Sequence, residues 1–204
     1  MTTRREFLQA GIGVSALPIL SGVSVSSQAR AVEEPVLTPL HKVIFDERFP
    51  DSVAFGSEAE KIGMPVHGIR GDMTDLWVND LCDCWKNAPS AIAGLTAHGP
   101  LFCLEHLAWD YGMRVVFRAE HTYLPNDRIE HVLSGPESLL GQAANLNDCG
   151  PNWGSRVARM VARCPGNRVK LTAATVMIAA PAQAQTTDEQ GSLFSWIIAP
   201  VARA

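Results

Sequence analysis

The sequence has 204 residues, of which 47% are hydrophobic and 19% are charged, and its formal net charge is −4. A chain of this length and composition can bury a sizeable core in a single domain. Its acidic balance argues against a nucleic-acid partner, because phosphates require a basic protein surface.

The first 31 residues have the three parts of an export signal. Arg4 and Arg5 supply positive charge, residues 10–25 form an apolar run, and residues 29–31 (Ala-Arg-Ala) fit a small-x-small cleavage site. The arginine pair followed by residues 7–8 (Phe-Leu) resembles the twin-arginine (Tat) export signal, and the resemblance is confined to this segment. It implies that the Tat translocase exports the chain, already folded, to the periplasm.

The apolar run of the signal is too weak for a membrane anchor, which needs about 20 uninterrupted apolar residues. Three glycines and Pro18 interrupt it, so we expect cleavage before Val32 and a single domain over residues 32–204. This cleavage removes three arginines and one glutamate, leaving 14 basic and 20 acidic residues. No later stretch is apolar enough to span a membrane, so the mature chain is expected to be soluble.

Short apolar runs alternate with amphipathic segments from residue 42 to residue 118, which predicts strands joined by helices. Apart from Arg114, the run at 113–117 is apolar, and this indicates a strand with helices over both faces. We therefore expect an α/β three-layer domain with a mostly parallel, Rossmann- or flavodoxin-like sheet. The predicted strands are 42–46, 65–69, 91–95 and 113–117, and the predicted helices between them are 52–62, 72–86 and 100–111.

The C-terminal half has a looser pattern. It predicts one further strand at 129–133 and helices at 137–145 and 154–163. The segments 169–180 and 193–199 are apolar and rich in residues that favour strands. We expect these two segments to form a C-terminal antiparallel hairpin at one edge of the sheet.

Polar residues follow the predicted parallel strands, where ligands bind in open α/β sheets. The segment 94–103 runs from a strand through a turn at Gly99 into a helix, and free amides at such a helix start can hold an anion. The turn has no nucleotide-binding motif, and a tight connection without a ligand is the alternative. The predicted ligand-binding residues are Arg48, His98, Gly99, Arg118, Glu120 and His121.

Three residues with catalytic chemistry lie on one stripe of the predicted helix 100–111. Cys103, His106 and Asp110 are spaced i, i+3 and i+7. One interpretation makes Cys103 a nucleophile whose pKa is lowered by the helix start, with His106 as base and Asp110 orienting that base. The alternative is a solvated helix flank, which we prefer because catalytic partners seldom all come from one helix.

The five cysteines all follow the signal, and disulfides persist in the oxidising periplasm. The odd number leaves at least one thiol unpaired in a monomer, and Cys149 with Cys164 is a reasonable pair. Cys82 and Cys84 are weak evidence for a metal, and no metal ligand or cofactor is assigned. A less favoured alternative is a metal site at the strand ends, formed by His98, Cys103, Glu120 and His121.

Two classes of function remain. The first is a non-catalytic exported protein, either an accessory or escort subunit of an exported oxidoreductase or a binder of a small anionic ligand. Trp109 lies off the apolar arc of its helix, so it is a candidate for a partner contact. The second is a small thiol-dependent hydrolase or transferase that uses Cys103 with a histidine. We prefer the first, because no residue set reaches the specificity of known catalytic motifs.

Overall fold

The structure is a computed structural model that describes residues 39–125, 127–146, 150–163, 174–181 and 191–201. All of them belong to one compact unit, Glu34–Ala204. None of the helices in these ranges is long and apolar enough to cross a membrane.

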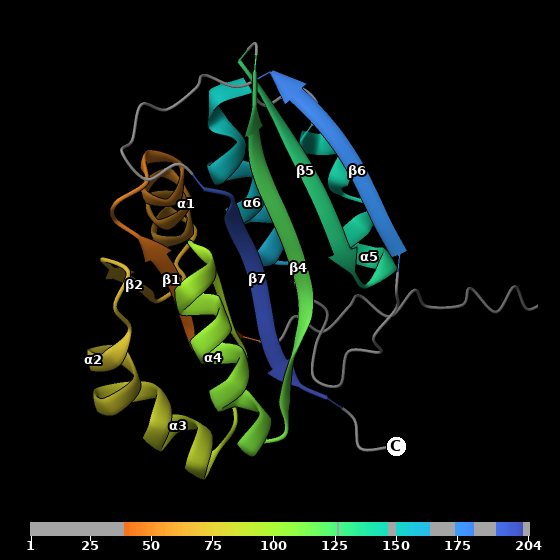
Figure 1. The fold of residues 1–204 in the computed structure, drawn as a ribbon. Coiled ribbons are helices and arrows are strands. Elements are labelled where there is room, and N and C mark those ends of the chain that lie inside the picture. The colour runs from red at the N-terminus through yellow and green to blue at the C-terminus, as the bar shows by residue number, and fades with distance from the viewer. Residues whose placement is uncertain (1–38, 126, 147–149, 164–173, 182–190, 202–204) are drawn as a thin grey trace, which may run out of the picture. The chain divides into compact units, whose positions relative to one another are not determined.

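One open sheet of seven strands organises the described residues, in the order β2-β1-β3-β7-β4-β5-β6 (Figure 1). β1 pairs in parallel with β2 and β3, whereas β7 is antiparallel to both β3 and β4. It follows that β1, β2, β3 and β4 all point in one direction. The strands are β1 (Lys42–Asp46), β2 (Val66–Ile69), β3 (Ile92–Thr96), β4 (Met113–Leu124), β5 (Arg128–Gly135), β6 (Ala174–Pro181) and β7 (Leu193–Pro200).

The prediction of an α/β fold is confirmed, but the prediction of a mostly parallel sheet is wrong. Four of the six neighbouring pairs in the described sheet are antiparallel. The cause is β7, which lies between the two parallel strands β3 and β4, together with β5 and β6, which extend the sheet beyond β4 (Figure 1). Hydrophobic periodicity reports how deeply a strand is buried, and it does not report which strands lie beside it.

The predicted C-terminal hairpin is also wrong, although both of its strands exist. β6 pairs with β5 at the edge of the sheet, whereas β7 lies in the middle between β3 and β4. Every residue of β7 except Pro200 is buried. A strand buried on both faces needs a neighbour on each side and a covering layer on each face, so it takes a central position.

Local sequence signals mark some of the helix ends, although the predicted bounds of α1 and α4 differ from the observed ones by one or two residues and the helix predicted at 137–145 ends at Leu140. Pro50 occupies the first turn of α1, where its missing N–H costs nothing. Gly63 and Gly112 follow α1 and α4 with φ of 82° and 69°, a conformation that favours glycine and ends a helix. The helices are α1 (Pro50–Lys61), α2 (Thr74–Leu76), a π-helix (Trp77–Leu81), α3 (Cys82–Asn87), α4 (His98–Asp110), α5 (Glu137–Leu140) and α6 (Trp153–Val161), with short 3-10 helices at Ala143–Leu146 and Gly150–Asn152.

Two hydrophobic clusters lie on opposite faces of the sheet. Along β7, Trp196 and Ile198 belong to one cluster, and Ile197 between them belongs to the other. The cluster that contains Trp196 also includes residues of α3 and α4, and the cluster that contains Ile197 includes residues of α1, α5 and α6. Helices therefore cover both faces of the sheet (Figure 1). The central strands of the sheet therefore pack against helices on both faces.

Candidate functional site

A cavity of about 440 Å³ lies at the carboxyl ends of β1 and β3. Phe49 reaches it from the loop between β1 and α1, and the connection between β3 and α4 forms a second wall. The third wall is the start of β7, whose Phe194 is paired with Thr96 at the end of β3. The cavity is lined by Phe49, Ala97, His98, Gly99, Gly191, Ser192 and Phe194.

The cavity lies at the point where the chain leaves the sheet in two directions. After β1 the chain enters α1, whose Phe55 belongs to the cluster on one face of the sheet. After β3 it enters α4, whose Leu101 belongs to the cluster on the other face. β1 and β3 are neighbours, so their loops diverge and leave a crevice between them. This topological switch point is where open α/β sheets bind ligands.

The walls of this switch-point cavity combine apolar surface with free backbone donors. Phe49, Ala97 and Phe194 supply the apolar part. α4 begins at His98, and its N-cap residue Ala97 makes no side-chain hydrogen bond to the first amides. The position of a Cβ on Gly99 is open, with no atom within 4 Å. The start of α4 thus has no side-chain cap for the amides of His98 and Gly99, while Pro100 carries no N–H, and the helix dipole places a partial positive charge beside the cavity.

Arg118 adds a positive charge beside the same cavity. Its guanidinium lies over the ring of Phe194, 4.9 Å from the ring centroid. Within the described ranges no carboxylate forms an ion pair with it. A cation held over the face of an aromatic ring remains able to attract an anion.

Arg48 lies near the cavity but its charge is already balanced. Its Nε and Nη2 donate to the two carboxylate oxygens of Asp46 at 2.9 and 2.8 Å, and Asp46 is completely buried. A bidentate pair of this kind is strong and directional. Arg48 also lies over the ring of Phe49, at 5.3 Å from the centroid, so it positions a cavity wall.

Glu120 and His121 do not line the cavity, because β4 is longer than the predicted strand. The strand continues to Leu124, so both residues lie within it and point to opposite faces. Glu120 is exposed, whereas His121 is completely buried under α6, with its ring 4.5 Å from that of Trp153. Of the predicted ligand-binding residues, the structure therefore brings together His98, Gly99 and Arg118.

His121 belongs to a buried hydrogen-bond network. Its Nε2 lies 2.8 Å from Ser195 Oγ, and its Nδ1 lies 2.6 Å from Nδ1 of His131. Burial lowers the pKa of His121 well below its ordinary value, with His131 adding to the effect, and burial lowers the pKa of His131 to about 4. Both rings are neutral near pH 7, and the network is closed to solvent.

Sequence reasoning missed His131 and Ser195, although one signal was present. His121 and His131 are directly opposite in the pairing of β4 with β5. Had the strand at 113–117 been extended to the turn near residue 127, the symmetric placement of the two histidines about that turn would have predicted their contact.

The predicted catalytic residues Cys103, His106 and Asp110 all lie on the exposed side of α4. His106 Nδ1 donates to the carbonyl oxygen of Phe102 at 2.9 Å. No hydrogen bond joins the three residues to one another in the described structure. Their catalytic assignment stays a prediction.

The described residues contain no group of three or more His, Cys, Asp and Glu side chains placed to hold a metal ion. Cys82, Cys84 and Cys103 are free thiols. The predicted disulfide partners Cys149 and Cys164 lie outside the described residues.

Comparison with protein-family models, curated proteins and solved structures finds no match. The interpretation of the site rests on its geometry.

Proposed function

We propose that this protein is a periplasmic binder of a small organic anion and that the ligand occupies the switch-point cavity. The observation that carries the proposal is the position of that cavity, between the diverging loops of β1 and β3 and in front of the uncapped start of α4. Its volume of about 440 Å³ is in the range of small-molecule sites. The resemblance of the first residues to a Tat signal supports export.

The chemistry of the walls favours a carboxylate joined to an apolar or aromatic body. The rings of Phe49 and Phe194 suit the apolar body. The amides at the start of α4 suit the carboxylate, and Arg118 adds long-range attraction. The parallel strands β2, β1 and β3 have helices on both faces of the sheet, which supports the finer proposal that this half of the domain is three-layered and flavodoxin-like. The next strand, β7, departs from that pattern because it is antiparallel to β3.

The proposal is tested by thermal unfolding of the purified protein with benzoate, phenylacetate and hexanoate, each compared with its neutral amide. We expect at least one carboxylate to raise Tm in a saturable manner, because a ligand that binds only the folded state stabilises it. Ala97→Phe fills the cavity and is expected to abolish the shift. Arg118→Met keeps the apolar stem but removes the charge, and is expected to weaken carboxylate binding about tenfold, or about 1.4 kcal/mol.

Ala88→Phe is the matched control, because Ala88 is exposed after α3 and does not line the cavity. It should respond to carboxylates as the unchanged protein does. The proposal fails if none of the three carboxylates shifts Tm, or if Ala97→Phe and Ala88→Phe respond equally.

A second candidate function is an accessory or escort subunit for an exported oxidoreductase. It is favoured by an aromatic stripe on α4, where Phe102 and Trp109 are 50% and 48% exposed. The ring of His106 lies between them, 4.2 and 4.6 Å from their centroids. Exposed aromatic side chains are enriched where proteins dock. The carboxylate titration separates the two candidates, since docking alone predicts no saturable shift.

A further inference from the structure

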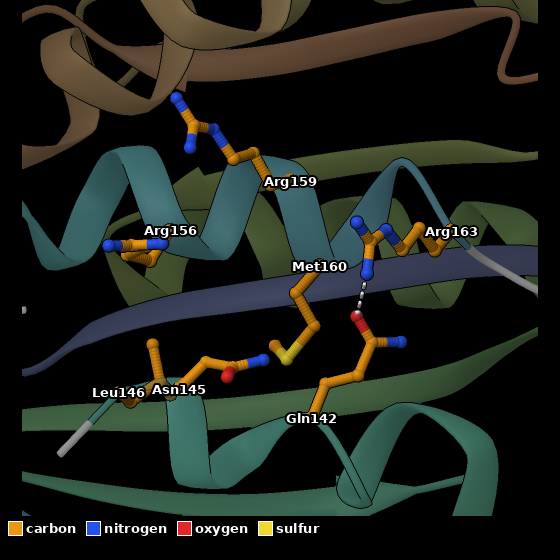
Figure 2. A pocket seen from close by; sticks show the side chains of 7 residues that line it. All are labelled: Gln142, Asn145, Leu146, Arg156, Arg159, Met160 and Arg163. Carbon is orange, nitrogen blue, oxygen red and sulfur yellow. Dashed lines mark hydrogen bonds between the residues drawn. The ribbon is translucent and has the colours of Figure 1, made fainter.

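A second and smaller pocket, of about 130 Å³, lies between α6 and the segment that contains α5 and the following 3-10 helix. None of its described lining residues lines the switch-point cavity. Figure 2 shows Met160 extending from α6 toward the opposite wall, with the arginines along the helix. The pocket is lined by Gln142, Asn145, Leu146, Arg156, Arg159, Met160 and Arg163.

The pocket carries three positive charges in a chain whose net charge is negative. Arg156, Arg159 and Arg163 are spaced i, i+3 and i+7, and the described residues that line the pocket include no carboxylate. The charge of Arg159 is balanced by a residue outside the pocket, because its Nε donates to Glu58 Oε1 on α1 at 2.6 Å. Among the described residues, neither Arg156 nor Arg163 forms an ion pair.

The position of Arg156 is not explained by the helix that carries it. Cations near the C-terminus of a helix are stabilised by the helix dipole, which accounts for Arg159 and Arg163. Arg156 is instead the fourth residue of α6, in the N-terminal half, where the dipole disfavours a cation. It also lies one turn from Arg159, and like charges at this spacing repel. An anion in the pocket would offset both costs.

The side chains around the pocket are donors suited to an oxyanion. Guanidinium groups match the geometry of phosphate and sulfate, and carboxamide N–H groups add further donors. The existing contact of Arg163 Nη1 with Gln142 Oε1 is long, at 3.5 Å, and is marked in Figure 2. A charge-assisted hydrogen bond to an anion is shorter and stronger, so replacing the contact with Gln142 by a bond to a bound anion would stabilise Arg163.

The size of the pocket limits the ligand to one anionic group. A volume of about 130 Å³ accommodates a phosphate or sulfate but not a nucleotide or a sugar with its phosphate. We propose that this pocket is a binding site for a single tetrahedral oxyanion, phosphate or sulfate, held between Arg156 and Arg163 with the Gln142 side chain. The oxyanion is either the free ion or the terminal group of a phosphomonoester whose remainder lies outside.

The test is isothermal titration calorimetry of the full chain with inorganic phosphate and with sulfate, in chloride buffer of matched ionic strength. We expect saturable binding of phosphate or sulfate. Arg156→Gln and Arg163→Gln are each expected to lower the affinity about tenfold or more, because each removes a charged donor. Arg114→Gln makes the same charge change on an exposed residue of β4 outside the pocket and should keep the original affinity.

NMR of the unchanged protein tests the same site without relying on variants that could fold poorly. Phosphate should shift the side-chain NMR signals of Arg156 and Arg163 and leave that of Arg114 in place. Glycerol phosphate distinguishes the sources of the ligand: competition with inorganic phosphate supports a phosphomonoester end, and its failure to compete supports the free ion. The cavity-filling Ala97→Phe should bind phosphate normally, which keeps this result separate from the carboxylate site.

The inference is overturned if neither anion binds saturably above the chloride background. It is equally overturned if Arg156→Gln and Arg114→Gln weaken binding to the same degree, because that result describes diffuse surface attraction.

Discussion

At the scale of single residues, the buried pair of His121 and His131 is the most constrained feature of the core. The two Nδ1 atoms are 2.6 Å apart, so one imidazole must donate its hydrogen to the other. The pair can hold this hydrogen bond only while at least one Nδ1 is unprotonated. His131 Nε2 has no hydrogen-bond partner within the described structure, so the network is satisfied at one end only.

Acid is expected to destabilise the protein through these histidines. Their folded-state pKa values are depressed, to about 4 for His131 against an ordinary 6.5. The unfolded chain therefore binds more protons below pH 6.5, so stability is fully present above that pH and is lost as the pH falls toward 4. At about 1.4 kcal/mol per pKa unit, His131 contributes a loss of about 3 kcal/mol. Urea unfolding at pH 7.5, 6.5, 5.5 and 4.5 measures it.

Two variants separate the contribution of these histidines to the loss of stability in acid from the contribution of the carboxylates, which also titrate in acid. His131→Phe removes one titrating group, and its stability should fall less steeply over the same pH range, although it starts lower because His121 loses a partner. His106→Gln changes an exposed histidine and should keep the original slope. Equal slopes for His131→Phe and the unchanged protein would refute the explanation.

At the scale of elements, α1 and α6 cross at very short distance. A Cβ on Gly154 of α6 would overlap the backbone carbonyl of Asp51 in α1. Ser155 Oγ donates to the carbonyl of Ala54 at 3.3 Å, and the Arg159–Glu58 pair joins the same two helices. This close crossing fixes where α6 lies, and with it Arg156 and Arg159, which line the smaller pocket.

Gly154→Ala is expected to destabilise the protein by about 1–3 kcal/mol, because neither backbone at the crossing can move away without disturbing its packing. The matched control is Gly99→Ala in the first turn of α4, where the added methyl group meets nothing within 4 Å. That change should be neutral or stabilising by about 0.5–1 kcal/mol. Urea unfolding compares the two, and a Gly154→Ala protein as stable as Gly99→Ala would contradict the close crossing.

At the scale of the whole molecule, the sheet is completed by its last strand. β7 pairs with β3 and with β4, and both of these strands lie far from β7 in the sequence. Non-local pairing of this kind slows folding. A fold that closes only when its C-terminal strand is in place is compatible with the Tat export that we propose, because that exporter accepts folded chains.

Export by the Tat route is expected to depend on the arginine pair of the signal. Replacing Arg4 and Arg5 with lysine keeps the charge but removes the twin-arginine pattern, so we expect the chain to accumulate uncleaved in the cytoplasm. The unchanged chain should be recovered from the periplasm with Val32 as its first residue. Fractionation with intact-mass analysis measures both, and normal export of the lysine variant would exclude the Tat route.

Some of the site was predictable because it depends on local order in the chain. His98 and Gly99 follow a buried strand and begin the next helix, so their place at the strand ends could be inferred from the sequence, and both line the cavity. Glu120 and His121 were misplaced, since the end of β4 depends on its pairing with β5. The arginine pocket was not predicted, because its walls come from segments brought together only by packing.

The sequence by itself determined the α/β class, the positions of most helices and strands, and the strand-to-turn-to-helix segment that bounds the cavity. These follow from periodicity, helix ends and turns, which act over a few residues. Only the tertiary structure decided that β7 lies between β3 and β4, that two histidines meet in the core and that Arg156, Arg159 and Arg163 share a pocket. Such choices depend on burial and pairing between distant segments, whose free energies no local pattern records.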